Sequence, residues 1–218
     1  MAKYIRITSS SNFGNILSVV VAGVCLPFLP MTSVQLLLLN LLYDTLCLVL
    51  PWDAVDAESC TKPLEWSGRT LGRFMRHFGP LSSLFDLLTF GFLYFVLCPA
   101  VCGGAFSTLN PVERIYFAAA FQTGWFLESL WTQVLILHLL RTQKIPFLQS
   151  RPSRPVMVIT TLGLVLFTAL TFTPAGQWMG LTALPPIYFG FLIQVVLLYL
   201  LLVTLAKGRY CKKYRELL

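Results

Sequence analysis

The sequence predicts an all-α polytopic membrane protein: a bundle of six transmembrane helices with both termini in the cytoplasm. Hydrophobic residues make up 56% of the chain and charged residues only 11%, whereas a soluble domain carries about 25% charged residues. The mean hydropathy is correspondingly high, at +0.74. A helix that crosses a bilayer needs about 20 predominantly apolar residues. We expect one membrane domain over residues 1–218, with spans at about 12–30, 32–50, 81–100, 116–139, 156–173 and 186–206.

Polar or Pro/Gly-rich joints separate these apolar runs. The first two spans are predicted to form a hairpin, because Pro27 and Pro30 end one helix and start the next. The joint at 51–80 contains a basic amphipathic stretch, Arg69–Arg76. This stretch predicts either an interfacial helix whose arginines reach lipid head groups or a docking surface for a cytoplasmic partner. The other wide joints lie at 101–115, 140–155 and 174–185.

The basic residues predict the orientation of the bundle. Only Arg114 lies on the outer side of the six predicted spans. By the positive-inside rule both termini are therefore cytoplasmic, in a multi-pass protein of the inner (plasma) membrane. We interpret the net charge of +7 as a topology signal and as attraction to anionic lipid at the cytoplasmic face, and nucleic acid is not expected as a partner. The inner-side residues are Lys3, Arg6, Lys62, Arg69, Arg73, Arg76, Arg141, Lys144, Arg151, Arg154, Lys207, Arg209, Lys212, Lys213 and Arg215.

Asn40 and Asp44 place a carboxamide and a carboxylate one helical turn apart inside the second apolar run. An ionisable group at the centre of a bilayer costs roughly 2.5–3.5 kcal/mol even on the lenient insertion scale. Such a residue is a functional-site candidate, and the hairpin indicates its partners. Asn15 lies about 14 residues before the turn and Asp44 about 15 residues after it, which places both roughly 20–23 Å from the outer end. Asn12 shares a helical face with Asn15.

These four side chains are therefore predicted to converge between two adjacent helices as a cation site. Amide and carboxylate oxygens suit hard cations such as Mg²⁺, Ca²⁺, Na⁺ or K⁺ and do not suit copper or zinc. A single carboxylate with several amides fits Mg²⁺, which keeps several waters and takes only one or two carboxylates. The alternative is that Asn12 and Asn15 lie near the cytoplasmic interface, while Asn40 and Asp44 join helices by hydrogen bonds.

Two further acids lie in apolar runs. Glu128, in the middle of the fourth span, is expected to face the bundle interior or a wet cavity, where it completes the ion site, relays a proton or binds helices together. Asp86 is expected about 8 Å into the third span, as an interfacial carboxylate or a carboxylate of the first helical turn near the positive end of the helix dipole. His138 is expected at the inner interface, beside Arg141.

The segment 9–15 (SSSNFGN) is followed by an apolar helix, a proline turn and the segment 40–44 (NLLYD). This succession resembles the fifth and sixth transmembrane helices of P-type cation-transporting ATPases. Later segments resemble the bacterial magnesium-transporting branch, and together they extend the resemblance over essentially the whole chain. They are LPWD (50–53), GRFM (72–75), GP (79–80), SSLFD (82–86), GWFLE (124–128) and LRTQKIPFLQSR (140–151).

The resemblance implies that the chain corresponds to helices five to ten of such a pump, with Mg²⁺ as the transported ion. It implies ion-site roles for Asn12, Asn15, Asn40 and Asp44. Asn15 stands where calcium-transporting relatives carry a carboxylate, which argues against a calcium pump. Tyr43 stands where relatives often carry a small polar residue.

Several parts of such a pump are missing from the sequence. It contains no DKTGT phosphorylation loop, no TGES motif, no nucleotide-binding region and no proline-kinked fourth helix. Because phosphoryl transfer needs those parts, we expect no ATP site on this chain and no ATP hydrolysis by the chain alone. It is then a C-terminal fragment, a split gene product that reassembles with its catalytic half, or a remnant. The alternatives are an independent cation channel or carrier, and a non-catalytic membrane partner of a full-length pump.

Overall fold

Long helices form at each of the six predicted apolar segments. The structure is a computed structural model and describes residues 2–53, 68–142 and 150–214. The long helices are α1 (Ala2–Cys25), α2 (Ser33–Leu48), α3 (Gly68–Phe92), α5 (Pro111–Leu140), α6 (Arg154–Leu170) and α8 (Pro186–Tyr214). The short elements are the 3₁₀ turn η1 (Leu50–Trp52), the π-helix η3 (Leu93–Leu97), α4 (Cys98–Cys102) and α7 (Pro174–Trp178).

The helices differ in how well their length and composition suit a membrane. Among the described residues, three helical segments are long and apolar enough to cross one: Ile5–Cys25, Gly68–Cys102 and Pro186–Tyr214. Helices α2 and α6 are apolar but shorter, with 16 and 17 residues. Helix α5 has 30 residues and buries polar as well as apolar side chains. The chain is thus an all-helical membrane protein, and the count of six spans stays a prediction.

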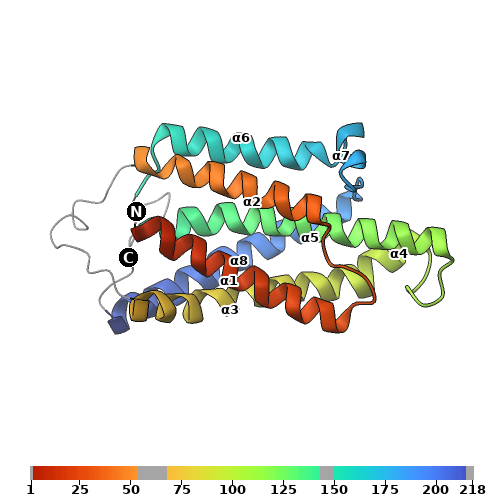
Figure 1. Cartoon of the computed structure of the whole chain (residues 1–218), viewed down its shortest axis with the longest axis horizontal. Coiled ribbons are helices and arrows are strands. Elements are labelled where there is room, and N and C mark those ends of the chain that lie inside the picture. The colour runs from red at the N-terminus through yellow and green to blue at the C-terminus, as the bar shows by residue number, and fades with distance from the viewer. Residues whose placement is uncertain (1, 54–67, 143–149, 215–218) are drawn as a thin grey trace.

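Helix α5 forms the centre of the bundle. It contacts α1, α2, α3, α4, α6 and α8. In Figure 1, α2 and α6 run along one side of α5, and α1 and α3 run along the other. Its apolar side chains point in all directions, as expected for a helix surrounded by others. Any polar side chain in the middle of α5 is therefore enclosed by neighbouring helices.

Helices α1, α3 and α6 begin at one end of the bundle, where α2, α5 and α8 end (Figure 1). Arg6, Arg69, Arg154 and Lys212 are therefore gathered at that end, while Arg114 lies near the start of α5 at the other. This distribution matches the predicted grouping of charges, and which side is cytoplasmic stays a prediction. Lys62, Lys144 and Arg215, which the orientation argument also used, lie outside the described residues.

Buried charges hold this basic end together. Arg141 donates a hydrogen bond to Asp53 at 2.7 Å, and both side chains are at most 9% exposed. The other Asp53 oxygen accepts from the backbone N–H of Ser153, next to the start of α6. Lys207 of α8 donates to the Leu139 carbonyl at 2.9 Å, which satisfies a carbonyl near the end of α5. These bonds fix the ends of α2, α5, α6 and α8 relative to one another.

Helices α1 and α3 pack closely because small residues face each other. A Cβ on Gly14 would lie 3.0 Å from the carbonyl oxygen of Gly79, so a larger residue at position 14 would require the two helices to shift apart. Ser83 donates to the Gly14 carbonyl at 2.8 Å. Helix α3 is also longer than predicted, because it runs through Pro80 without a break. Arg69–Arg76 form the first turns of α3, and their predicted role, at the lipid interface or as a docking surface, stays a prediction.

Candidate intramembrane cation site

The four predicted ligands lie on two helices that meet near the basic end of the bundle. Thr8 of α1 and Cys47 of α2 are in contact, with 3.9 Å between Oγ1 and Sγ. Tyr43 is buried beside Thr8 and Ser11. Asn12 and Asp44 are the next residues along their helices after Ser11 and Tyr43. One predicted ligand on each helix is thus adjacent in sequence to a residue of the α1–α2 contact.

The four side chains do not form a closed ligand shell within this chain. Asn12, Asn40 and Asp44 are exposed, and Asn15 is half-buried. In the described part of the chain, no hydrogen bond or ion pair joins any two of them. Nor do the described residues hold a group of three or more His, Cys, Asp or Glu side chains that could bind a metal ion. The predicted convergence therefore stays a prediction that needs further ligands from elsewhere.

The surroundings of Asn40 and Asp44 are apolar. Leu37, Leu41 and Leu48 of α2 are 67%, 59% and 73% exposed, and they share the open side of α2 with the two polar residues. Such an apolar surface belongs in lipid or against another helix. A carboxylate that faces lipid is costly, so Asp44 is an unfavourable residue among these leucines. We refer to the exposed residues Asn12, Asn40 and Asp44 with half-buried Asn15 as the open polar face.

Glu128 lies on α5, whereas the open polar face belongs to α1 and α2. Its side chain is fully buried, and its charged neighbour is Asp86 of α3. Tyr188 and Tyr199 of α8 also lie near it. In the described residues no hydrogen bond or ion pair joins Glu128 to Asn40 or Asp44. The prediction that Glu128 faces the bundle interior is confirmed, whereas its role as a ligand stays untested.

The predicted position of Asp86 is wrong. It is 2% exposed and lies about five turns beyond the start of α3, counting 3.6 residues per turn. The prediction counted from residue 81, but α3 begins at Gly68. His138 is likewise buried, at 4% exposed, and its Nε2 lies 3.1 Å from Thr160 Oγ1 of α6. Both side chains thus belong to contacts between helices.

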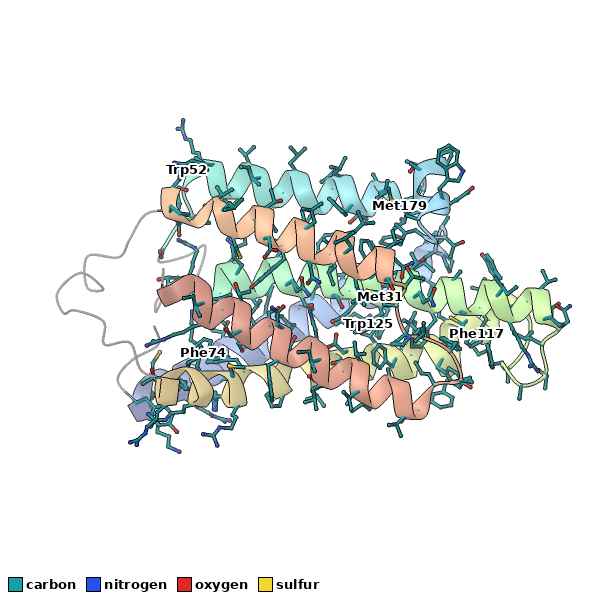
Figure 2. All side chains as sticks on the ribbon, viewed as in Figure 1. Met31, Trp52, Phe74, Phe117, Trp125 and Met179 are labelled. Carbon is teal, nitrogen blue, oxygen red and sulfur yellow. The ribbon has the colours of Figure 1, made fainter. Side chains whose placement is uncertain are left out.

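Sequence reasoning missed the environment of Asp86. Trp125 of α5 donates from its indole nitrogen to one Asp86 oxygen at 2.9 Å, and Ser18 of α1 lies 2.5 Å from the other. Trp125 lies midway along the bundle (Figure 2) and is 1% exposed. The signal available in the sequence was the pair of acids in two apolar runs. Their mutual contact depends on how α3 and α5 pack, which periodicity does not reveal.

Comparisons with known proteins identify a matching family and individual relatives. Residues 28–208 match the family described as the C-terminus of cation transporting ATPases. The chain is 44% identical over 214 residues to a magnesium-transporting ATPase, P-type 1, from Salmonella typhimurium strain LT2. It is 43% identical to a protein of the same description from Escherichia coli strain K12. Each alignment covers 98% of this chain but only 22% of the relative, so the chain spans about a fifth of the length of these relatives.

Proposed function

Because the chain belongs to the family of C-terminal regions of cation-transporting ATPases, we propose that it is the membrane part of an ATP-driven Mg²⁺ transporter. Asn12, Asn15, Asn40 and Asp44 supply part of the intramembrane ion site. The chain crosses the inner membrane six times, with both termini and the basic end of the bundle on the cytoplasmic side. Anionic lipid binds at that end, and the catalytic half of the pump is the protein partner.

One observation carries this proposal: the open polar face lies among exposed leucines. Asp44 carries a carboxyl group, which is unfavourable in lipid, and it forms no hydrogen bond or ion pair within the described residues. A covering helix that brings further oxygen atoms would relieve both defects at once, because a cation needs more ligands than these four side chains provide. The relatives, which are several times longer than this chain, contain sequence that can supply such a helix.

The ligand chemistry supports Mg²⁺ as the transported ion. The open polar face offers three amides and one carboxylate, all hard oxygen donors. Mg²⁺ retains several waters and binds through one or two carboxylates. Both relatives carry magnesium transport in their names.

The test is growth of a strain that lacks its own Mg²⁺ importers, on medium low in Mg²⁺. The strain receives this chain alone, or a chimera in which the chain replaces the matching C-terminal region of the Escherichia coli relative. We expect the chimera to restore growth and the chain alone to fail. Asp44→Ala in the chimera abolishes rescue, whereas Thr45→Ala, one residue away and also exposed, preserves it.

Two results would contradict the proposal. Rescue by the chain alone would support an independent channel or carrier. Rescue by the Asp44→Ala chimera at the level of the unmodified chimera would remove Asp44 from the ion path. Membrane levels of each protein, measured by immunoblot, separate loss of transport from loss of protein.

A further inference from the structure

Gln35 is a buried polar residue near the start of α2, the helix that carries Asn40 and Asp44. Its side chain is 0% exposed. The Oε1 atom accepts from the backbone N–H of Thr32 at 3.1 Å, and the Nε2 atom donates to the carbonyl of Gly180 at 2.9 Å. The first bond belongs to the capping box at the beginning of α2. The second bond connects α2 to the segment between α7 and α8, and a helix cap does not need it.

Gly180 is held in place independently of α2. Its φ is 76°, in the left-handed region that favours glycine. Its N–H donates to the carbonyl of Gln177 at 3.0 Å, and the N–H of Leu181 donates to the carbonyl of Gly176 at 2.9 Å. These two bonds form a Schellman motif at the end of α7. The carbonyl that Gln35 binds therefore has a fixed direction.

The same segment is attached to the central helix α5. The backbone N–H of Thr182 donates to the hydroxyl of Thr123 at 3.0 Å. Thr123 is fully buried, and its hydroxyl donates to the Ala119 carbonyl of α5 at 2.8 Å. Leu181, which precedes Thr182, is 2% exposed. Gln35 thus ties α2 to a segment that is itself hydrogen-bonded to the centre of the bundle.

Gln35 is also the first residue of the buried stripe of α2. Leu39 and Leu46 lie on the same side, about one and three turns further along, and are 3% and 1% exposed. Asn40 and Asp44 lie about one and a half and two and a half turns beyond Gln35, on the opposite side, and both are exposed. The hydrophobic effect that holds the leucines is non-directional, whereas a hydrogen bond has a preferred direction. Gln35 therefore supplies a directional contact that sets which side of α2 faces the bundle.

We propose that Gln35 is a positioning residue: its hydrogen bond to Gly180 fixes the rotation of α2 about its own axis and so directs the α2 ligands to the open polar face. This inference rests on the proposed function, because only an ion site gives the direction of Asn40 and Asp44 a consequence. Without the bond, α2 keeps its leucine packing but can turn. A turn moves both ligands away from any element that covers the open polar face.

Disulfide cross-linking measures the rotation of α2 in this chain alone, in lipid bilayers without Mg²⁺. Cys47 lies on the buried stripe of α2, with its Sγ atom 3.9 Å from Thr8 Oγ1 of α1. Thr8→Cys should therefore form a disulfide with Cys47 under mild oxidation, detected by mass spectrometry of the linked peptides. In that background we expect Gln35→Met to slow cross-linking by roughly 2- to 10-fold, the change in an equilibrium that one net hydrogen bond produces. An unchanged rate would overturn the proposal, as would failure of Thr8→Cys to cross-link at all.

Two control variants separate rotation from other effects. Gln122→Met removes another amide–carbonyl bond at the same end of the bundle, from α5 to Leu29 at 2.8 Å, and should leave cross-linking unchanged. Thr32→Val removes the hydroxyl that accepts from the Gln35 backbone N–H at 3.3 Å but keeps the bond to Gly180, so it should also leave cross-linking unchanged. Slowing by either control equal to that of Gln35→Met would assign the effect to the helix cap or to the bundle end and overturn the proposal.

A second variant acts on the acceptor segment and leaves α2 unaltered. Thr123→Val removes the hydroxyl that holds the backbone N–H of Thr182, and so loosens the segment around Gly180. We expect this variant also to slow cross-linking. If Gln35→Met does not fold, an unchanged rate in Thr123→Val overturns the proposal.

Mg²⁺ uptake by the chimera tests the consequence for the ion. Gln35→Met should raise the Mg²⁺ concentration for half-maximal uptake by roughly 2- to 10-fold and leave the maximal rate per protein nearly unchanged, because it weakens ligand binding without altering the driving step. Gln122→Met should change neither quantity. Slowed cross-linking with an unchanged half-maximal concentration would overturn the positioning role. Failure of the proposed function gives a different result, uptake that survives Asp44→Ala, and the cross-linking result does not depend on it.

Discussion

Asp44 and Asp86 carry the same chemical group in apolar helices of one bundle, but their surroundings are opposite. Asp86 is enclosed by α1, α3 and α5, with donors from Ser18 and Trp125. Asp44 is exposed among leucines. The difference shows that the helices of this chain enclose one of the two carboxyl groups and leave the other exposed. It predicts that substitutions at the enclosed site affect folding, whereas those at the open polar face affect transport.

The largest expected effect is at the enclosed site. Trp125→Ala removes a side chain that is 1% exposed, packs edge-on against Phe90 and donates to Asp86. We expect a loss of about 3–5 kcal/mol in the free energy of unfolding, because a large core side chain is lost together with a hydrogen bond. Circular dichroism during detergent-induced unfolding measures it. A loss below about 1 kcal/mol would mean that the site is not well packed.

The next-largest expected effect is a gain, in membrane insertion. Asp44→Leu in the chain alone removes an exposed carboxylate from an apolar face, so insertion should improve by up to roughly 2.5–3.5 kcal/mol. The same variant in the chimera should abolish Mg²⁺-dependent growth. A glycosylation-based insertion assay of the second span measures the first effect, and Leu41→Ala serves as its apolar control. Poorer insertion of Asp44→Leu would contradict the open character of this face.

A matched pair of serines tests the charge on Asp86. Ser18 donates to Asp86, and Ser83 donates to the neutral Gly14 carbonyl, from facing positions on α1 and α3. Hydrogen bonds to charged groups contribute about 1.5–3 kcal/mol and neutral ones about 0.5–1.5 kcal/mol. Ser18→Ala should therefore destabilise the bundle more than Ser83→Ala does in the same unfolding assay. Equal losses would indicate that Asp86 accepts this hydrogen bond without a charge.

The smallest effect is expected beside Asp44. Thr45 is exposed, and its hydroxyl donates to the Leu41 carbonyl of its own helix at 2.7 Å. Thr45→Val should change the free energy of unfolding by less than about 0.5 kcal/mol, as is usual for surface positions, and should leave rescue by the chimera intact. A loss of rescue at constant protein level would extend the cation site to a residue that the sequence did not indicate.

The sequence predicted the positions of the long helices, because apolar runs and proline or glycine joints are local signals. It placed Asp86 wrongly because the third span was expected to begin at residue 81, whereas α3 begins at Gly68 and continues through Pro80. It also did not predict which acids meet. The contact between Asp86 and Glu128 depends on the packing of α3 against α5, and the openness of Asn40 and Asp44 depends on what covers α2. Both are tertiary properties that periodicity does not encode.

The most direct test of the central claim is calorimetric Mg²⁺ binding to three purified proteins: the chain alone, the chimera and the Asp44→Asn chimera. Any other metal sites contributed by the rest of the pump are the same in both chimeras, so their difference isolates the intramembrane site. The account predicts that the chimera binds one more Mg²⁺ than its Asp44→Asn variant, and that the chain alone binds none with comparable affinity. Equal binding by the two chimeras, or full binding by the chain alone, would contradict it.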